Sequence, residues 1–236
     1  MGAGYAVLLV PEKIKDLSRK VSPNLIVKPF GNETIGEGDF EEVKTQIEKS
    51  DSIAIGMGIG RSEESLEMAR KIIDYAVSKG KKLVVDADAI YAIGKAARLN
   101  KNVAVTPQEK EFVQLYGEEE SKELNERVSQ AVALANSIGA TVVAKGHTTI
   151  ITNGKLLRLN TAETSALATM GTGDVLSGII AGYAATGAVM LDACAAGVYL
   201  HSRAGDLLAL EKGTHIIAED LIDIIPKIIK AYDKRE

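Results

Sequence analysis

Short runs of β-branched and aliphatic residues alternate along this chain with segments of helical periodicity, and this alternation limits the possible folds more than any other feature. The runs lie at residues 5–10, 52–56, 82–86, 102–106 and 141–145. Each is almost continuously apolar, as expected for parallel strands that helices cover on both faces. The intervening segments 62–79 and 122–137 repeat apolar residues at the spacing of a helix face. The sequence therefore predicts an α/β fold of three layers, with a mostly parallel central sheet between two layers of helices.

One segment interrupts this alternation. The stretch "TTIITNGKLLRL" places Asn153-Gly154 between two strand-like runs, which predicts a hairpin with a two-residue type I′ turn. Only helices follow, from about Asp174, from about Leu191 to Leu210 and from about Glu219 to Tyr232. Because the sequence has no internal repeat and no linker rich in Gly, Pro or Ser, we expect residues 1–236 to form a single domain.

The composition favours a small-molecule partner. The formal net charge of -4 comes from interspersed charges of both signs, so no basic patch for nucleic acid or a membrane surface is expected. The uncharged run from Val175 to Leu191 contains Gly, Ser and Thr and falls short of the roughly 20 strongly apolar residues of a membrane span. The single cysteine, Cys194, lies in an apolar segment, which is typical of a reducing compartment. We therefore expect a cytoplasmic protein.

Ligands of open α/β sheets bind outside the carboxyl ends of the strands, so the residues just past each strand are the candidates. The stretch "GTGDVLSGII" joins small residues to a helix start at residues 171–174. Free N–H groups at such a start favour a phosphate, and Asp174 would then act as a base on a hydroxyl that attacks it. The alternative is that Asp174, at or near the N-cap, only caps the helix.

The stretch "VVAKGHTTIITNG" places Lys145 at a strand end. Its ammonium can bind a phosphate as a point charge, while Thr148, Thr149 and backbone groups bond a nucleotide. The alternative is a solvated lysine in a turn.

Acidic residues and glycines follow other strands. The glycine-rich "IGMGIGR" lacks the spacing of a dinucleotide fingerprint, and a plain tight turn explains it equally well. Of Asp86 and Asp88, one is expected to cap a helix, and the other to face the site or hold a cation indirectly. Glu109 and Glu111 either stabilise a helix start or hold water on a phosphate-bound magnesium ion.

Taken together, these motifs in this order resemble the ADP- or ATP-dependent NAD(P)H-hydrate dehydratases of the ribokinase-like superfamily, and the likeness spans essentially the whole chain. The blocks that carry it are "GAGYAVLLVPE", "IGMGIGR", "VVDADAI", "TPQEKEFVQLYG", "VVAKGHTTIITNG", "GTGDVLSGIIAGYAATG" and "AAGVYLHSRAGDLLA". A GxGD element alone marks only the superfamily. The TPxxxEF block followed by KGxxT and GTGDVL is much more specific.

The resemblance implies a ribokinase-like fold and a lyase that repairs hydrated NADH or NADPH with ADP or ATP and Mg²⁺, by phosphorylating the ring hydroxyl and expelling phosphate. It implies that Asp174 is the catalytic base. It also assigns nucleotide contacts to Lys145, Gly146, His147, Thr148, Thr149, Gly171, Thr172 and Gly173. It further implies that Gly58, Gln108 and Asp174 contact the hydrate and that Glu111 contacts the metal indirectly. The family habit further implies a homo-oligomer.

This chain departs from the family pattern at several positions. Gln108 stands where the family usually has His, Met57 where it usually has Pro, and Met170 replaces the first glycine of a GGTGD pattern. Members usually carry a leading segment with an HKG block and a GS…GA loop that helps to bind the hydrate, and the printed sequence starts after the position of that segment. We expect the hydrate pocket to be completed by a segment that the printed sequence does not include, or to be completed differently. Two other functions stay open, a small-molecule kinase of the same superfamily and a nucleotide-binding module without turnover.

Overall fold

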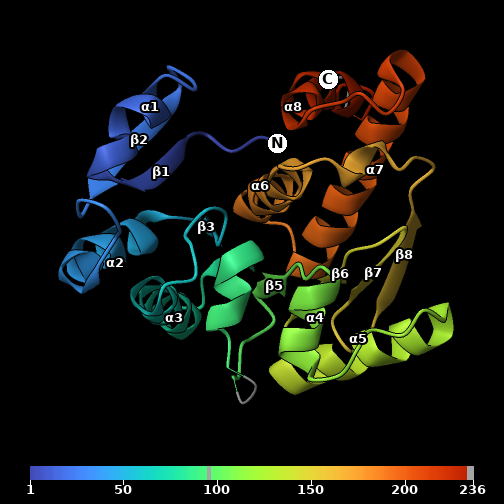
Figure 1. Ribbon diagram of the computed structural model, residues 1–236, viewed down its shortest axis with the longest axis horizontal. Helices are drawn as coiled ribbons and strands as arrows, with labels where there is room; N and C mark the ends of the chain where they lie inside the picture. Colours follow the sequence, from blue (N-terminus) through green and yellow to red (C-terminus); the bar gives the residue numbers. More distant parts are fainter. Residues whose placement is uncertain (95–96, 233–236) are drawn as a thin grey trace.

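The computed structural model describes residues 1–94 and 97–232, and its strands and helices alternate as the sequence predicts (Figure 1). The strands are β1 (Ala6–Pro11), β2 (Leu25–Phe30), β3 (Ser52–Ile55), β4 (Lys82–Val85), β5 (Val103–Val105), β6 (Thr141–Ala144), β7 (Thr148–Thr152) and β8 (Leu157–Thr161). The α-helices are α1 (Lys15–Arg19), α2 (Phe40–Lys49), α3 (Glu63–Ser78), α4 (Glu109–Tyr116), α5 (Leu124–Ile138), α6 (Thr172–Ala185), α7 (Met190–Lys212) and α8 (Ala218–Ile229). Each strand predicted from an apolar run is therefore confirmed to within a residue or two at its ends.

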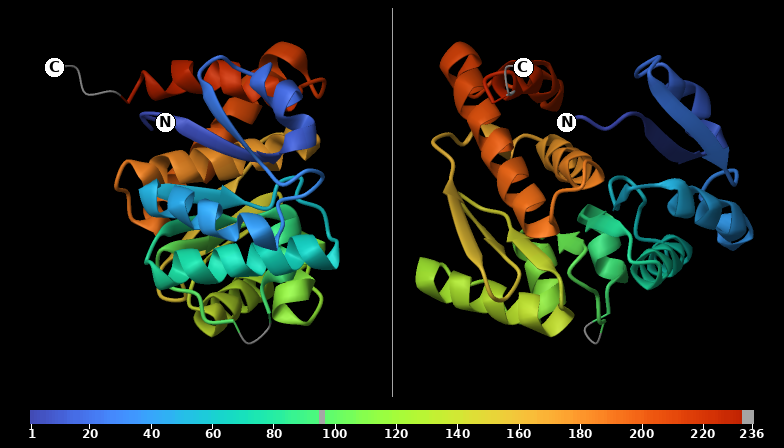
Figure 2. Two further views of the ribbon diagram at one scale, coloured as in Figure 1. Left: turned by 90° about the vertical axis from the view of Figure 1, so that its left-hand side faces the viewer. Right: turned by 180° about the vertical axis from the view of Figure 1, so that it is seen from behind.

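A six-stranded sheet in the order β3-β4-β5-β6-β7-β8 forms the centre of the molecule. Its strands β3 to β6 are parallel to one another, β7 pairs antiparallel with β6, and β8 pairs antiparallel with β7. Leu83 and Val85 pack with α3 and α5 on one face, whereas Val84 packs with α6 and α7 on the other. Both faces of the sheet are thus covered by helices, and the predicted three-layer α/β fold is confirmed (Figures 1 and 2).

The strand predicted at residues 5–10 does not join this sheet. β1 pairs in parallel with β2, and the two form a separate two-stranded sheet that lies apart from β3 (Figure 2). The sequence analysis missed β2, whose segment "LIVKPF" carries Lys28 and Pro29 within a short apolar run and so lacks a clear strand signal. That residues 1–236 form a single domain remains a prediction.

The hairpin is confirmed, but the predicted two-residue turn is wrong. Thr152 pairs with Leu157, so the loop comprises residues 153–156. A type I′ turn needs positive φ at both central residues, and of Asn153 and Gly154 only the glycine has it. Asn153 instead accepts hydrogen bonds from the N–H groups of Lys155 and Leu156 through its Oδ1, which stabilises the longer loop.

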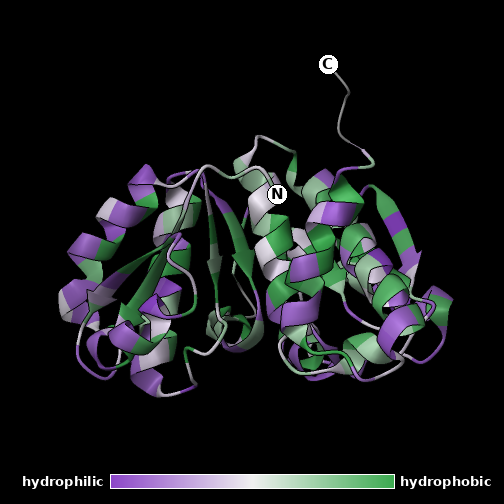
Figure 3. Cartoon of the chain, turned by 90° about the horizontal axis from the view of Figure 1, so that it is seen from above, coloured by the Kyte–Doolittle hydropathy of each residue, from purple (hydrophilic) through white to green (hydrophobic). Residues whose placement is uncertain are grey.

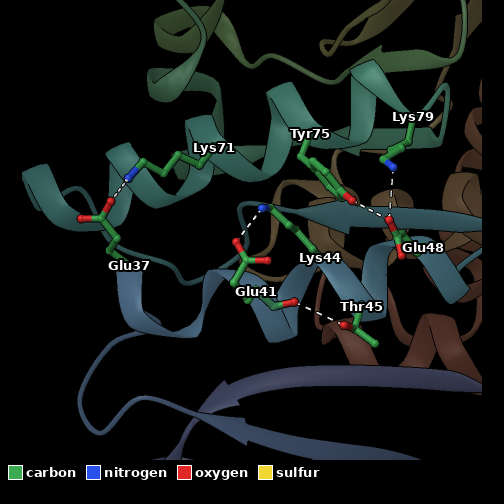
Figure 4. Close-up of polar contacts among 8 residues, drawn as sticks. All are labelled: Glu37, Glu41, Lys44, Thr45, Glu48, Lys71, Tyr75 and Lys79. Carbon is green, nitrogen blue, oxygen red and sulfur yellow. Dashed lines mark hydrogen bonds and ion pairs between the residues drawn. The ribbon is translucent and has the colours of Figure 1, made fainter.

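Polar contacts join α2 to α3 on the side of the molecule that carries β1 and β2. The Tyr75 hydroxyl donates to Glu48 Oε1 at 2.6 Å, and Lys79 Nζ lies 3.2 Å from the same oxygen (Figure 4). Lys71 likewise pairs with Glu37, which precedes α2. Because α2 leads directly into β3, these contacts fix the connection between the two sheets.

The predicted helices after the hairpin are confirmed as α6, α7 and α8, and Cys194 is buried within α7. Hydrophobic residues gather along the strands and the inward faces of the helices, with hydrophilic residues outside (Figure 3). None of the helices in the described part of the chain combines the length and apolarity needed to span a membrane.

Gly56, which follows β3, permits a close approach between two strand ends. Its φ is 126°, and a Cβ added there would lie 1.7 Å from the carbonyl oxygen of Asp86. The neighbouring Asp86 N–H donates to Ile55 O at 3.0 Å. Only a residue without a side chain fits between these backbones, so Gly56 sets the position of Asp86 relative to β3.

We expect Gly56→Ala to lower the free energy of unfolding by more than about 3 kcal/mol, because both the backbone conformation and the contact with Asp86 O become strained. Gly80→Ala is the matched control, since Gly80 also has positive φ but open space around it, and it should cost only about 1 kcal/mol. Urea unfolding of both variants measures the difference. Equal losses would contradict the close approach.

Candidate functional site

The carboxylate of Asp86 connects the strand ends to α6. It follows β4 and is 1% exposed. Its Oδ1 accepts the Lys145 ammonium at 2.7 Å and the Ala87 N–H at 2.8 Å, and its Oδ2 accepts the Ser177 hydroxyl at 2.7 Å. Asp86 thus caps the 3₁₀ helix Ala87–Ala92 and faces the site at once, two roles that the sequence analysis divided between Asp86 and Asp88.

The network brings Lys145 close to the segment Gly171–Asp174 at the start of α6. A Cβ added at Gly173 would lie 3.7 Å from Lys145 Nζ and 3.9 Å from Asp86 Oδ2. These residues come from the end of β6, the first turn of α6 and the end of β4. The lysine is therefore a half-buried, paired side chain, and the reading of a solvated lysine in a turn is wrong.

Asp174 is not the cap of its helix. The N-cap of α6 is Gly171, with φ 87°, and Asp174 is the third residue of the helix. No side-chain cap hydrogen bond is present at this helix start, and the Asp174 side chain is exposed. The Thr172 hydroxyl instead donates to Leu167 O at 2.7 Å, which fixes the approach to the helix. The first N–H groups of α6 keep no intrahelical partner, as at every helix start.

The electrostatic surroundings of Asp174 suit a proton acceptor. Partial burial raises the pKa of its carboxyl above the ordinary value, the Asp86 charge raises it further, and the Lys145 charge lowers it. A raised pKa brings a carboxylate closer to the range in which a general base works well.

The loop after β6 rests on a side chain that the sequence analysis missed. The Arg127 guanidinium donates to Thr148 O at 3.2 Å and pairs with Glu120 at 2.8 Å. A Cβ on Gly146 would approach the Arg127 Nη2 to 2.9 Å. Arg127 lies in a helix pattern far from any motif, so only the tertiary structure reveals this contact.

The remaining predicted residues of this loop lie on and just before β7. His147 is exposed, and its carbonyl accepts the Ala162 N–H at 3.1 Å. The Thr149 hydroxyl donates to Gly146 O at 3.2 Å, and the Thr148 and Thr161 hydroxyls are 3.0 Å apart. The loop is therefore held by threonine hydroxyls and by the backbone of β8 and Ala162, at the same sheet edge as Lys145.

The loop after β3 lies next to the end of β4. Gly58 is exposed with φ 72° and open space around it. Asp88 accepts the Gly60 N–H at 3.1 Å and pairs with Arg61 at 2.6 Å. The Arg61 guanidinium also stacks over the Tyr91 ring at 3.9 Å. These contacts tie the loop to the 3₁₀ helix that Asp86 begins.

Glu111 stabilises the start of α4. Its Oε2 accepts the Gln108 N–H at 2.8 Å, and the side chain is buried. Burial raises the pKa of its carboxyl above the ordinary value. The stabilising role considered for this position is confirmed, while Gln108 and Glu109 are exposed. Among the described residues, no group of three or more His, Cys, Asp or Glu side chains could hold a metal ion.

His201 supports the first turn of α6 from α7 and is a second residue without a sequence signal. Its Nε2–H donates to Thr172 O at 2.8 Å. Burial lowers the pKa of the imidazole from 6.5 to about 4, so the ring is neutral at physiological pH. Met170, which lies just before this helix start, is 95% exposed.

Comparisons with known proteins point to one family. A family model described as NAD(P)H-hydrate dehydratase matches residues 1–227. The ADP-dependent (S)-NAD(P)H-hydrate dehydratase of Nitrosopumilus maritimus is 34% identical over 236 residues, covering 99% of this chain and 81% of the relative. The bifunctional NAD(P)H-hydrate repair enzyme Nnr of Pyrobaculum aerophilum is 31% identical over 98% of this chain, which spans only 46% of that relative. The chain is thus about half the length of such bifunctional relatives.

A solved structure extends the likeness to three dimensions. The ADP/ATP-dependent NAD(P)H-hydrate dehydratase from Bacillus subtilis, co-crystallised with ATP/Mg²⁺ and soaked with CoA, aligns at a TM-score of 0.78 and 25% identity. The alignment covers 98% of this chain and 83% of the relative's. The predicted ribokinase-like fold is confirmed.

The His201 pKa predicts a pH-dependent stability. Because its native pKa lies below 6.5, the unfolded state takes up a proton first as the pH falls, and the free energy of unfolding falls between pH 6.5 and about 4. Between pH 7 and 5 the loss should be about 2 kcal/mol. Urea unfolding of His201→Gln should lack this loss, whereas the exposed His215→Gln should retain it. The same pH profile in both variants would contradict the assignment.

Proposed function

The chain belongs to the NAD(P)H-hydrate dehydratase family, and from this premise we propose that it uses ADP or ATP to dehydrate hydrated NADH or NADPH. The observation that carries the proposal is the Asp86 network, which holds Lys145 beside Gly173 at the start of α6. A cation, a helix N-terminus and an exposed carboxylate, Asp174, thereby lie together at the sheet edge.

The nucleotide phosphates bind between Lys145 and the first turn of α6. The ammonium supplies a point charge, and the backbone N–H groups of Gly171, Thr172 and Gly173 supply donors on the positive end of the helix dipole. Gly146, His147, Thr148 and Thr149 contact the rest of the nucleotide from the loop that Arg127 supports. Glycine at 173 suits this role, because a side chain there would project toward Lys145.

Asp174 acts as the base. Its carboxylate takes the proton of the ring hydroxyl as the hydroxyl oxygen attacks the terminal phosphoryl group of the nucleotide. A base is required here because a neutral hydroxyl is a weak nucleophile. The exposed position of Asp174 in the first turn of α6 lets it reach a substrate hydroxyl.

Phosphorylation converts a poor leaving group into a good one. Phosphate then departs with the electron pair of the C–O bond, pushed out by the lone pair of the ring nitrogen, and loss of a proton from the adjacent carbon restores the double bond. Gly58, Gln108 and Asp174 contact the hydrate, since the exposed loops after β3 and β5 lie at the same sheet edge.

Mg²⁺ would arrive with the nucleotide, because the carboxylates of the residues that the structure describes do not form a protein cage. The described residues offer no cluster of three metal-binding side chains, and Mg²⁺ bound through phosphates keeps several waters. One oxygen of Glu111 is already bonded to the Gln108 N–H, and we propose that the other contacts the ion through water. The bound ion would neutralise part of the phosphate charge. A cytoplasmic location and a homo-oligomeric state remain predictions.

We expect Asp174→Asn to lower the turnover number at least about a hundredfold, because general base catalysis contributes factors of that size. Recovery of the NADH absorbance band from hydrated NADH, with ADP and ATP in separate reactions, measures turnover. Asp192→Asn, at an exposed aspartate near the start of α7, is the control and should remain active.

Failure of the wild-type chain to restore NADH with either nucleotide would contradict the dehydratase proposal. Accumulation of a stable phosphorylated product would favour a small-molecule kinase, and tight nucleotide binding without turnover on any candidate would favour a binding module.

We expect Lys145→Ala to weaken nucleotide binding by about 1 to 3 kcal/mol, the range for hydrogen bonds to charged groups. Calorimetric titration with ADP and with ATP measures the change and shows which nucleotide the wild type prefers. Lys155→Ala, at an exposed lysine of the hairpin loop, should leave affinity unchanged. If both variants bind like the wild type, Lys145 does not contact phosphate.

A further inference from the structure

The loop after β3 ends in an arginine whose side chain is held on two sides. The Arg61 Nε–H donates to Asp88 Oδ1 at 2.6 Å, and the guanidinium lies over the Tyr91 ring, 3.9 Å from the ring centre. The other oxygen of Asp88 accepts the Gly60 N–H at 3.1 Å. One bonded edge and one stacked face leave the guanidinium little freedom to rotate. Arg61 is therefore fixed in place before any ligand binds.

The remaining edge of the Arg61 guanidinium is open. Within residues 1–94 and 97–232, nothing accepts a hydrogen bond from its Nη1 or Nη2. The side chain is 54% exposed, whereas that of its partner Asp88 is 22% exposed. Two Nη groups in one plane match the oxygens of a carboxylate or a phosphate. Arg61 thus presents a preformed pair of donors to an anion at the surface.

Two other cations at this end of the sheet are engaged differently. The Arg127 guanidinium pairs with Glu120 and donates to Thr148 O, and its side chain is only 14% exposed. The Lys145 side chain is 15% exposed and lies beside the start of α6, where the nucleotide phosphates are proposed to bind. Of these three cations, Arg61 alone is more than half exposed. It is the one available to a second anionic ligand.

Arg61 lies close to the proposed hydrate contact. Gly58 precedes it by three residues, which span at most about 11 Å. In a nicotinamide dinucleotide a single ribose separates the ring from the first phosphate. Burial raises the pKa of the Glu111 carboxyl, whereas the Lys145 and Arg61 charges both lower it, so both cations act on one carboxylate of the site. A ring at Gly58 therefore places its phosphates within the range of Arg61.

We propose that Arg61 binds a phosphate group of the hydrated dinucleotide through Nη1 and Nη2, while Asp88 and Tyr91 hold the guanidinium in place. The identity of this ligand rests on the proposed function. Two groups of the dinucleotide share this chemistry, the diphosphate that NADH and NADPH both contain and the 2′-phosphate of NADPH alone. The nucleotide and the dinucleotide then have separate cations, Lys145 and Arg61.

The test measures equilibrium binding of NADH and of NADPH by the change in their fluorescence, so it does not require turnover of the hydrate. Arg61→Gln should weaken binding at least about tenfold, because a hydrogen bond between charged groups is lost. Its affinity should also fall less steeply with salt concentration than that of the wild type, which a rearranged loop alone would not produce. Equal losses for both dinucleotides identify the diphosphate, and a loss confined to NADPH identifies the 2′-phosphate. The affinity for ADP should be unchanged.

Arg70→Gln is the matched control. Arg70 of α3 is 51% exposed, and it bonds Glu67 and Ala92 O of the 3₁₀ helix, but it lies outside the loop after β3. This variant should bind both dinucleotides like the wild type. Three results would overturn the proposal: no binding of either dinucleotide by the folded wild type, equal affinities of Arg61→Gln and the wild type, or an equal loss in Arg70→Gln. If binding depends on Arg61 but the hydrate is not dehydrated, the proposed reaction is wrong and the phosphate contact stands.

Discussion

The buried ion pair between Asp86 and Lys145 is the interaction on which the rest of the site depends. A carboxylate that is 1% exposed is tolerated only when its oxygens are bonded. Asp86 meets this condition with the N–H of Ala87, with Lys145 and with Ser177 of α6. The requirement to satisfy one buried charge therefore holds the ends of β4 and β6 against the first turns of α6.

The same pair sets the electrostatics of the proposed base. Asp86 and Lys145 act on the Asp174 pKa in opposite directions, and burial adds to the effect of Asp86. Loss of Asp86 would remove the bond to Ser177 of α6, and loss of either partner would change the charge that Asp174 experiences. Bound phosphate would compete with Asp86 for the Lys145 ammonium. Lys145 would then compensate the Asp86 charge less, and that charge would raise the Asp174 pKa further.

The sequence predicted what depends on local pattern. Apolar runs and helical periodicity located the central strands. The rule that ligands bind at strand ends placed Lys145 near residues 171–174, and the structure shows Lys145 Nζ close to Gly173. Long-range partners were not predictable from local pattern. The side chains of Ser177, Arg127 and His201 bond Asp86, Thr148 and Thr172, which lie far from them in the sequence. The alternative in which Asp174 only caps its helix is wrong, because Gly171, with positive φ, starts the helix without a side-chain bond.

The two halves of the proposed site differ in what holds them. The nucleotide half is fixed by a buried network and by His201 beneath the first turn of α6, all within the central sheet and its helices. The hydrate half lies on the loop after β3, where Gly56 is locked against Asp86 O while Gly58 and Gly60 have open space around them. The proposed hydrate half therefore depends on the conformation of one glycine-rich loop, whereas the proposed nucleotide half depends on the bonds that satisfy Asp86.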